Sequence, residues 1–152
     1  MGIKTKYGEL QKKYNLPSYL DVNNDFEISS LEDEKFLLRT IRRKIAEKAE
    51  AYAKIIEPVL MPESTQASLH ECQLFTEEEK KELYNLFKKM MYFDRLSIEI
   101  SINETDEKTA NFINEFWKEW GSIKSELTNI IKKLKEGWTK EISLKEEKSY
   151  LG

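Results

Sequence analysis

The sequence predicts an all-α fold, an antiparallel up-down-up bundle of three long helices, and three observations support it. The 152 residues include five glycines and three prolines but are 35% charged, a composition typical of long helices with few turns. Apolar residues recur at spacings of three and four over 113–134, as in a helix packed lengthwise on another. Short connections between the predicted helices favour antiparallel neighbours. Residues 1–138 are therefore expected to form one domain.

A short amphipathic helix is predicted at the start, over Ile3–Tyr14, because Ile3, Tyr7 and Leu10 share one face. Pro17 disfavours helix in the residue before it. The connector 16–28 is too apolar for a free linker. We expect it to cover one end of the core of the bundle.

The first long helix is predicted over 30–57, with Ser29 or Ser30 as its N-terminal cap. Pro58 is expected in its last turn, and Pro62 ends it before a polar loop over 63–73. Its apolar seam repeats every seven residues, with two further positions between. The seam consists of Leu31, Leu38, Ile41, Ile45, Tyr52, Ile55 and Val59.

The second long helix is predicted over 76–102, where Thr76 and Glu79 have the spacing of a capping box. Residues 96–102 alternate between apolar and polar, which taken alone indicates a strand. A strand needs a partner, and the same residues continue the helical stripe from Phe93. We therefore favour helix.

The third long helix is predicted over 105–136, capped by Thr105 or Asn103 and ended by Gly137. Its seam is Ile113, Phe116, Trp120, Ile123, Leu127, Ile130 and Leu134. The charged segment 139–152 is expected to be a flexible tail, with Trp138 holding its beginning against the bundle.

Charge and cysteine content limit the class of protein. A net charge of −3 argues against a surface built entirely for nucleic acid, although a local basic patch remains open. A lone Cys72 and the absence of a secretory leader pattern favour a cytosolic protein. Its apolar runs are far shorter than the ~20 residues that span a bilayer, so no membrane location is expected.

A basic strip on the first long helix is the strongest functional signal, because three of the four arginines cluster there. Arginine binds phosphate and carboxylate with two parallel hydrogen bonds, so the strip suits RNA backbone or an acidic partner. The alternative is that these cations pair with acids of the bundle itself. The strip consists of Lys35, Arg39, Arg42, Arg43, Lys44 and Lys48.

Three aromatic residues are candidate contacts for a protein partner: Tyr84, Trp117 and Trp138. They lie beside the main apolar stripes, so each belongs either to a wide core face or to an exposed patch. Exposure would favour partner binding.

Catalytic and metal motifs have weak support. His70, Glu71 and Cys72 include zinc-binding residue types, but too few ligands are present at a known spacing, and no third group orients a Cys72 nucleophile. The acid pairs Glu47–Glu50 and Glu115–Glu119 have the spacing used by helical magnesium-dependent nucleotide hydrolases. No metal site and no cofactor are predicted.

The sequence thus predicts a non-enzymatic, cytosolic interaction or assembly module with a protein partner. The first alternative is an RNA-associated protein that uses the basic strip. The second is a helical nucleotide hydrolase dependent on magnesium. Self-association stays open, because the apolar seams can be buried within one chain or between two.

Overall fold

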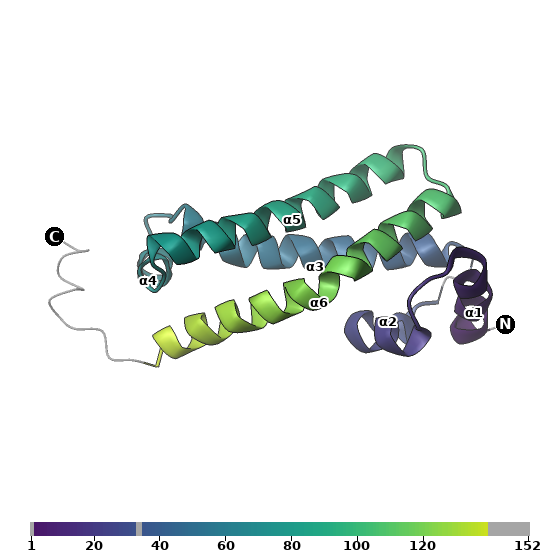
Figure 1. Cartoon of the computed structure of the whole chain (residues 1–152), viewed down its shortest axis with the longest axis horizontal. Helices are drawn as coiled ribbons and strands as arrows, with labels where there is room; N and C mark the ends of the chain where they lie inside the picture. The colour runs from purple at the N-terminus through teal and green to yellow at the C-terminus, as the bar shows by residue number, and fades with distance from the viewer. Residues whose placement is uncertain (1, 33–34, 140–152) are drawn as a thin grey trace, which may run out of the picture. The chain divides into compact units, whose positions relative to one another are not determined.

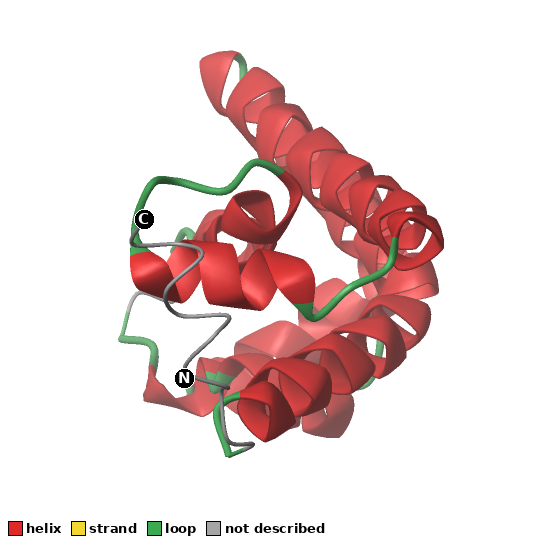
Figure 2. Ribbon diagram, turned by 90° about the vertical axis from the view of Figure 1, so that its left-hand side faces the viewer, coloured by secondary structure: helices red, strands yellow, loops and turns green. Residues whose placement is uncertain are grey.

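The computed structural model describes residues 2–32 and 35–139, and within these ranges it contains helices and no strand (Figure 2). The all-α prediction is therefore confirmed. Figure 1 labels six α-helices, and a short 3-10 helix, η1, joins α2 to α3. The elements are α1 (Ile3–Tyr14), α2 (Tyr19–Phe26), η1 (Ile28–Ser30), α3 (Leu37–Leu60), α4 (Gln66–Gln73), α5 (Glu77–Ile102) and α6 (Asp106–Gly137).

Contacts between residues divide the chain into two compact units. Unit 1 is formed by the described residues of 1–51 and 90–121, and unit 2 by those of 52–89 and 122–152. The boundaries fall inside α3, α5 and α6, so each of these helices contributes to both units. The single domain over 1–138 stays a prediction, and the predicted tail lies, apart from Thr139, outside the described residues.

Two short helices were not predicted. The connector 16–28 contains α2, and the predicted polar loop 63–73 contains α4. Each helix has a side-chain cap, because Ser18 Oγ accepts from Asp21 N at 3.2 Å and Thr65 Oγ1 accepts from Ser68 N at 3.2 Å. Such caps offset the short length of a helix by satisfying backbone donors at its first turn.

The first long helix begins and ends later than predicted. It starts at Leu37, so neither Ser29 nor Ser30 caps it, and Ser30 belongs to η1. Pro58 lies in its last turn, as expected. The predicted seam is wrong at Ile55, one of its two intermediate positions, because that side chain is 39% exposed while Ile56 is buried. A straight helix turns every 3.6 residues and drifts away from a seven-residue repeat over this length.

The other two long helices follow the prediction closely. Residues 96–102 are helical. The Thr76–Glu79 capping box forms, since each backbone N–H is bonded to the other residue's side chain. Thr105 caps α6 by accepting from Lys108 N at 3.2 Å. Along α6 the predicted seam is buried except at Ile130, which is half-buried.

The core of unit 1 is an aromatic cluster on α6. Phe26 of α2 lies 6.0 Å from the ring of Phe116 and 5.4 Å from that of Trp120, measured between ring centres. Trp120 Nε1 donates to Asp25 Oδ2 at 2.7 Å, so its one polar group is satisfied. Phe93 of α5 meets Phe116 edge-on at 5.2 Å. Large apolar rings thus hold α2 against α6 within unit 1.

In unit 2, α4 contacts the end of α6. His70 Nε2 donates to the carbonyl of Gly137 at 2.9 Å, which satisfies one of the free carbonyl groups at the helix end. A side chain at Gly137 would collide with Leu74, because an added Cβ would lie 2.3 Å from its Cδ1. Glycine therefore allows this close approach.

Candidate functional site

The basic strip does not present all its cations to solvent. Arg42 is 4% exposed, and its Nε and Nη2 donate to Oε2 and Oε1 of Glu104, both at 3.0 Å. Its Nη1 donates to the carbonyl oxygen of Ser97 at 3.1 Å and to Ser97 Oγ at 2.6 Å. Arg42 thereby joins α3 to α5 and to the turn before α6, a structural role within unit 1.

Glu104 brings a second arginine of the strip into the same cluster. Arg39 Nε lies 4.0 Å from Glu104 Oε1, and the Arg39 guanidinium stands 4.7 Å above the Phe36 ring. Thr109 Oγ1 donates to Glu104 Oε2 at 2.8 Å. Burial raises the pKa of Glu104, but hydrogen bonds from Arg42 and Thr109 outweigh it, so the net pKa lies below the ordinary value.

The remaining cations of the strip have different surroundings. Lys48 donates to the carbonyl of Asp25 and stands 5.0 Å from the Phe26 ring centre, so it helps to hold α2. Lys35 lies over Phe36 at 5.2 Å. Arg43 is exposed, and Lys44 is half-buried. The structure thus brings Arg39 and Arg42 together around an acid rather than around an open phosphate-sized site.

The three aromatic candidates are divided between the units. Trp117 is half-buried in unit 1, with its ring 6.0 Å from that of Phe26. Tyr84 and Trp138 belong to unit 2 and are about half exposed, at 51% and 50%. Trp138 Nε1 donates to Glu71 Oε2 at 3.1 Å, and its ring lies 4.4 Å from that of His70.

The residues considered for catalysis form no metal centre. Within the part of the chain that the structure describes, no group of three histidine, cysteine or acidic side chains is placed to hold an ion. Glu47, Glu50 and Glu115 are exposed, and Glu115 accepts from Tyr92 at 2.8 Å. His70 contacts Gly137 and Trp138, and Cys72 is half-buried.

A groove in unit 2 is the site that sequence reasoning missed. It has a volume of about 530 Å³ and lies between the first turns of α5 and the last turns of α6. Its floor is apolar, and its rim carries three carboxylates, two amides and one ammonium group. The lining residues are Phe75, Glu79, Glu82, Leu83, Asn85, Leu86, Glu126, Asn129, Ile130 and Lys133.

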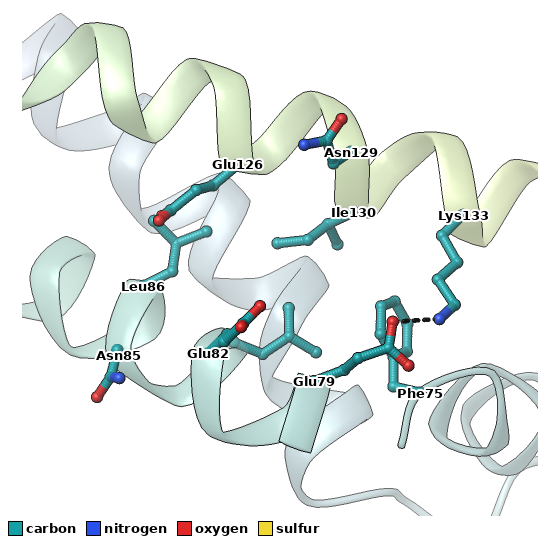
Figure 3. A pocket seen from close by; sticks show the side chains of 10 residues that line it. Phe75, Glu79, Glu82, Asn85, Leu86, Glu126, Asn129, Ile130 and Lys133 are labelled. Carbon is teal, nitrogen blue, oxygen red and sulfur yellow. Dashed lines mark hydrogen bonds and ion pairs between the residues drawn. The ribbon is translucent and has the colours of Figure 1, made fainter. Parts of the chain in front are cut away.

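Figure 3 shows how the charged groups lie around this groove. Glu82 extends from α5 and Glu126 from α6 toward the space between the two helices, where Leu86 and Ile130 also lie. Glu82 and Glu126 are exposed, and neither makes an ion pair with another described residue. Asn85 and Asn129 point away from the space.

One end of the groove is closed by an ion pair. Lys133 of α6 donates to Glu79 of α5, and the same ammonium lies 4.9 Å from the Phe75 ring centre. The hydrogen bond from Lys133, together with the backbone N–H of Thr76, lowers the pKa of Glu79 from 4.5 to about 2. The charge of Glu79 is thus compensated by Lys133, whereas no described cation pairs with Glu82 or Glu126.

Part of this groove can be recognised in the sequence. Glu79 was identified only as a helix cap, and Ile130 only as a seam position. On α5 the lining residues at 79, 82, 83 and 86 follow the helical repeat, as do those on α6 at 126, 129, 130 and 133. Acidic residues at the edge of an apolar stripe on two neighbouring helices are the sequence pattern that indicates such a groove.

No protein-family model, curated protein or solved structure matches this chain. None of the described helices is long and apolar enough to cross a membrane.

Proposed function

We propose that the protein is a non-enzymatic, cytoplasmic interaction module that binds a protein partner in the groove of unit 2. The observation that carries the proposal is the combination of an apolar floor with two carboxylates, Glu82 and Glu126, that form no ion pair with a described residue. Apolar area supplies affinity in protein interfaces, and charges at the rim orient the partner. The exposed Tyr84 on α5 adds a side-chain type that is common in such interfaces.

The order and direction of the three long helices are part of the proposal. We propose that α3, α5 and α6 run up, down and up as an antiparallel bundle, because short connections favour antiparallel neighbours. The RNA alternative has less support, since Glu104 already pairs with Arg42 and lies near Arg39. The hydrolase alternative has less support too, since the acids proposed for it do not gather.

A photo-cross-linking experiment in the source cell tests the docking site. Benzoylphenylalanine is placed at Glu126, whose side chain extends into the groove, or at Ser125, an exposed position of the same helix outside it. We expect a protein adduct from position 126 that survives nuclease treatment, and little or none from position 125. Equal labelling from both positions, or an adduct that nuclease removes, would contradict the proposal.

Two variants and one control complete this test. Ile130→Glu places a charge on the groove floor, and Glu82→Arg reverses an exposed charge directed into the groove if the first variant fails to fold. Ile131→Glu changes the neighbouring residue, which is 37% exposed and does not line the groove. The adduct should be lost in the groove variants and kept in the control.

A further inference from the structure

The groove has the dimensions needed to bind a short helix between its two walls. The lining residues span 79–86 on α5 and 126–133 on α6, about two turns or roughly 10 Å of each helix. On α6 they occur at spacings of three, one and three, and on α5 the residues at 79, 82, 83 and 86 have the same spacings with Asn85 in addition, so each wall is a ridge of helical side chains. A third helix packs well between two such ridges, because its own side chains interdigitate with them.

Unit 1 shows how the chain itself covers a comparable helix surface. There α2 is laid on α6 through Phe26, and Lys48 of α3 reaches the backbone of α2. In unit 2 the described residues place no helix over the groove, since α4 contacts the end of α6 at Gly137. The groove is therefore a surface that another molecule can cover.

The charges indicate the chemistry of that molecule. Three carboxylates and one ammonium line the groove, a net charge of −2. The Lys133–Glu79 pair is internally compensated, so the uncompensated charge belongs to Glu82 and Glu126, one on each wall. An occupant that presents cations on both flanks of an apolar face matches both carboxylates at once.

We infer that the groove takes an amphipathic helix of two to three turns from a protein partner, with lysine or arginine on both flanks of its apolar face. This inference rests on the proposed function and specifies its partner. Apolar side chains of the helix would cover Leu83, Leu86 and Ile130. Its cations would lie against Glu82 and Glu126.

Peptide binding to the full chain tests the inference. The probe is a fluorescein-labelled amphipathic peptide with leucines at helical spacing and lysines on both flanks, followed by fluorescence anisotropy. A second peptide has glutamate in place of each lysine, and a third has a central proline that breaks the helix. The lysine peptide should bind about tenfold more tightly than either of the others.

Charge reversal locates the binding. Glu82→Lys with Glu126→Lys should reverse the preference, so that the glutamate peptide binds more tightly than the lysine peptide. The matched control, Glu99→Lys with Glu107→Lys, changes the net charge equally at exposed residues of unit 1 and should keep the original preference. The inference is supported if the preference between the two peptides is reversed in the groove variant and unchanged in the control.

Each contrary outcome has a distinct meaning. If the groove variant and the control show the same charge preference, the inferred basic flanks of the partner are wrong. If the proline peptide binds as tightly as the lysine peptide, the inferred helical conformation of the partner is wrong. If the partner adduct at position 126 persists in either case, the docking function stands and only the assigned partner chemistry fails. Absence of both adduct and peptide binding would overturn both proposals.

Discussion

Glu104 accepts two parallel hydrogen bonds from the guanidinium of Arg42, and the side chains of both residues are at least nine-tenths buried. A buried ion pair of this kind contributes little net stability, but removal of one partner leaves a charge without compensation. Glu104→Ala should therefore lower the free energy of unfolding by about 3 kcal/mol. Urea denaturation measures the change. Glu107→Ala, at a neighbouring exposed acid, should stay within about 0.5 kcal/mol, and an equal loss in both variants would contradict the assignment.

Arg42 and Arg43 should differ strongly in their response to substitution, although they are adjacent in the basic strip. Arg42→Ala removes both parallel hydrogen bonds to the carboxylate of Glu104 and should clearly destabilise unit 1. Arg43 is exposed, so Arg43→Ala should change stability by less than about 0.5 kcal/mol. Arg43→Ala is thus the clean test of RNA binding: an unchanged affinity for a single-stranded RNA probe is expected, and a marked loss would revive the RNA alternative.

The acid stability of unit 2 should depend on Glu79. In the folded chain its pKa is about 2, whereas the unfolded carboxyl group titrates near 4.5. The unfolded state therefore binds the proton first as pH falls, so the stabilisation is complete above pH 4.5 and disappears progressively toward pH 2. Thermal unfolding of wild type and Glu79→Gln across this range should give curves that converge at low pH. A difference that stays constant down to pH 2.5 would exclude this role, and Lys133→Met is the reciprocal control.

The buried hydroxyl of Tyr7 fixes the turn after α1. It donates to the carbonyl of Pro17 at 2.6 Å, and burial raises the pKa of the phenol. Tyr7→Phe keeps the ring but leaves that carbonyl without its donor, so we expect a loss of about 1 kcal/mol in unfolding free energy. Tyr14→Phe removes a hydroxyl that takes no part in this contact and should have a smaller effect. Equal losses would show that the ring environment, and not the hydrogen bond, determines the result.

Two glycines of α6 should give opposite results when replaced by alanine. A Cβ at Gly121 meets no atom within 4 Å, so alanine there should stabilise the helix by about 0.5–1 kcal/mol. A Cβ at Gly137 would displace Leu74, which should cancel this gain and destabilise the contact with α4. Thermal denaturation of the two single variants measures both signs, and a stabilising Gly137→Ala would contradict the close contact.

The sequence was most informative where one strong local rule acted. The Thr76–Glu79 pair and the candidate cap Thr105 placed the starts of two helices, because capping depends on residues only three positions apart. The strand-like pattern at 96–102 was correctly assigned to helix because it continued the stripe of Phe93. The short helices α2 and α4 were missed because each has few turns and its apolar period could not emerge.

The features that sequence could not predict depend on contacts between residues far apart in the chain. Nothing near Arg42 in the sequence indicates that Glu104, 62 residues away, occupies its guanidinium. The groove likewise requires the register between α5 and α6, which pairs Glu79 with Lys133 across 54 residues. The charges along one helix could be predicted from the sequence. Whether a charge is neutralised by an ion pair depends on which residues of another helix lie beside it.

The division of three helices between two units has a consequence for any attempt to isolate the groove. Neither unit is a continuous stretch of polypeptide, because unit 2 combines residues 52–89 with a second stretch that begins at 122. No truncation from either end can therefore remove unit 1 and leave both walls of the groove on one fragment. A minimal binding protein would need a new linker from α5 to α6 in place of residues 90–121, and its design would begin from the pairing of Glu79 with Lys133.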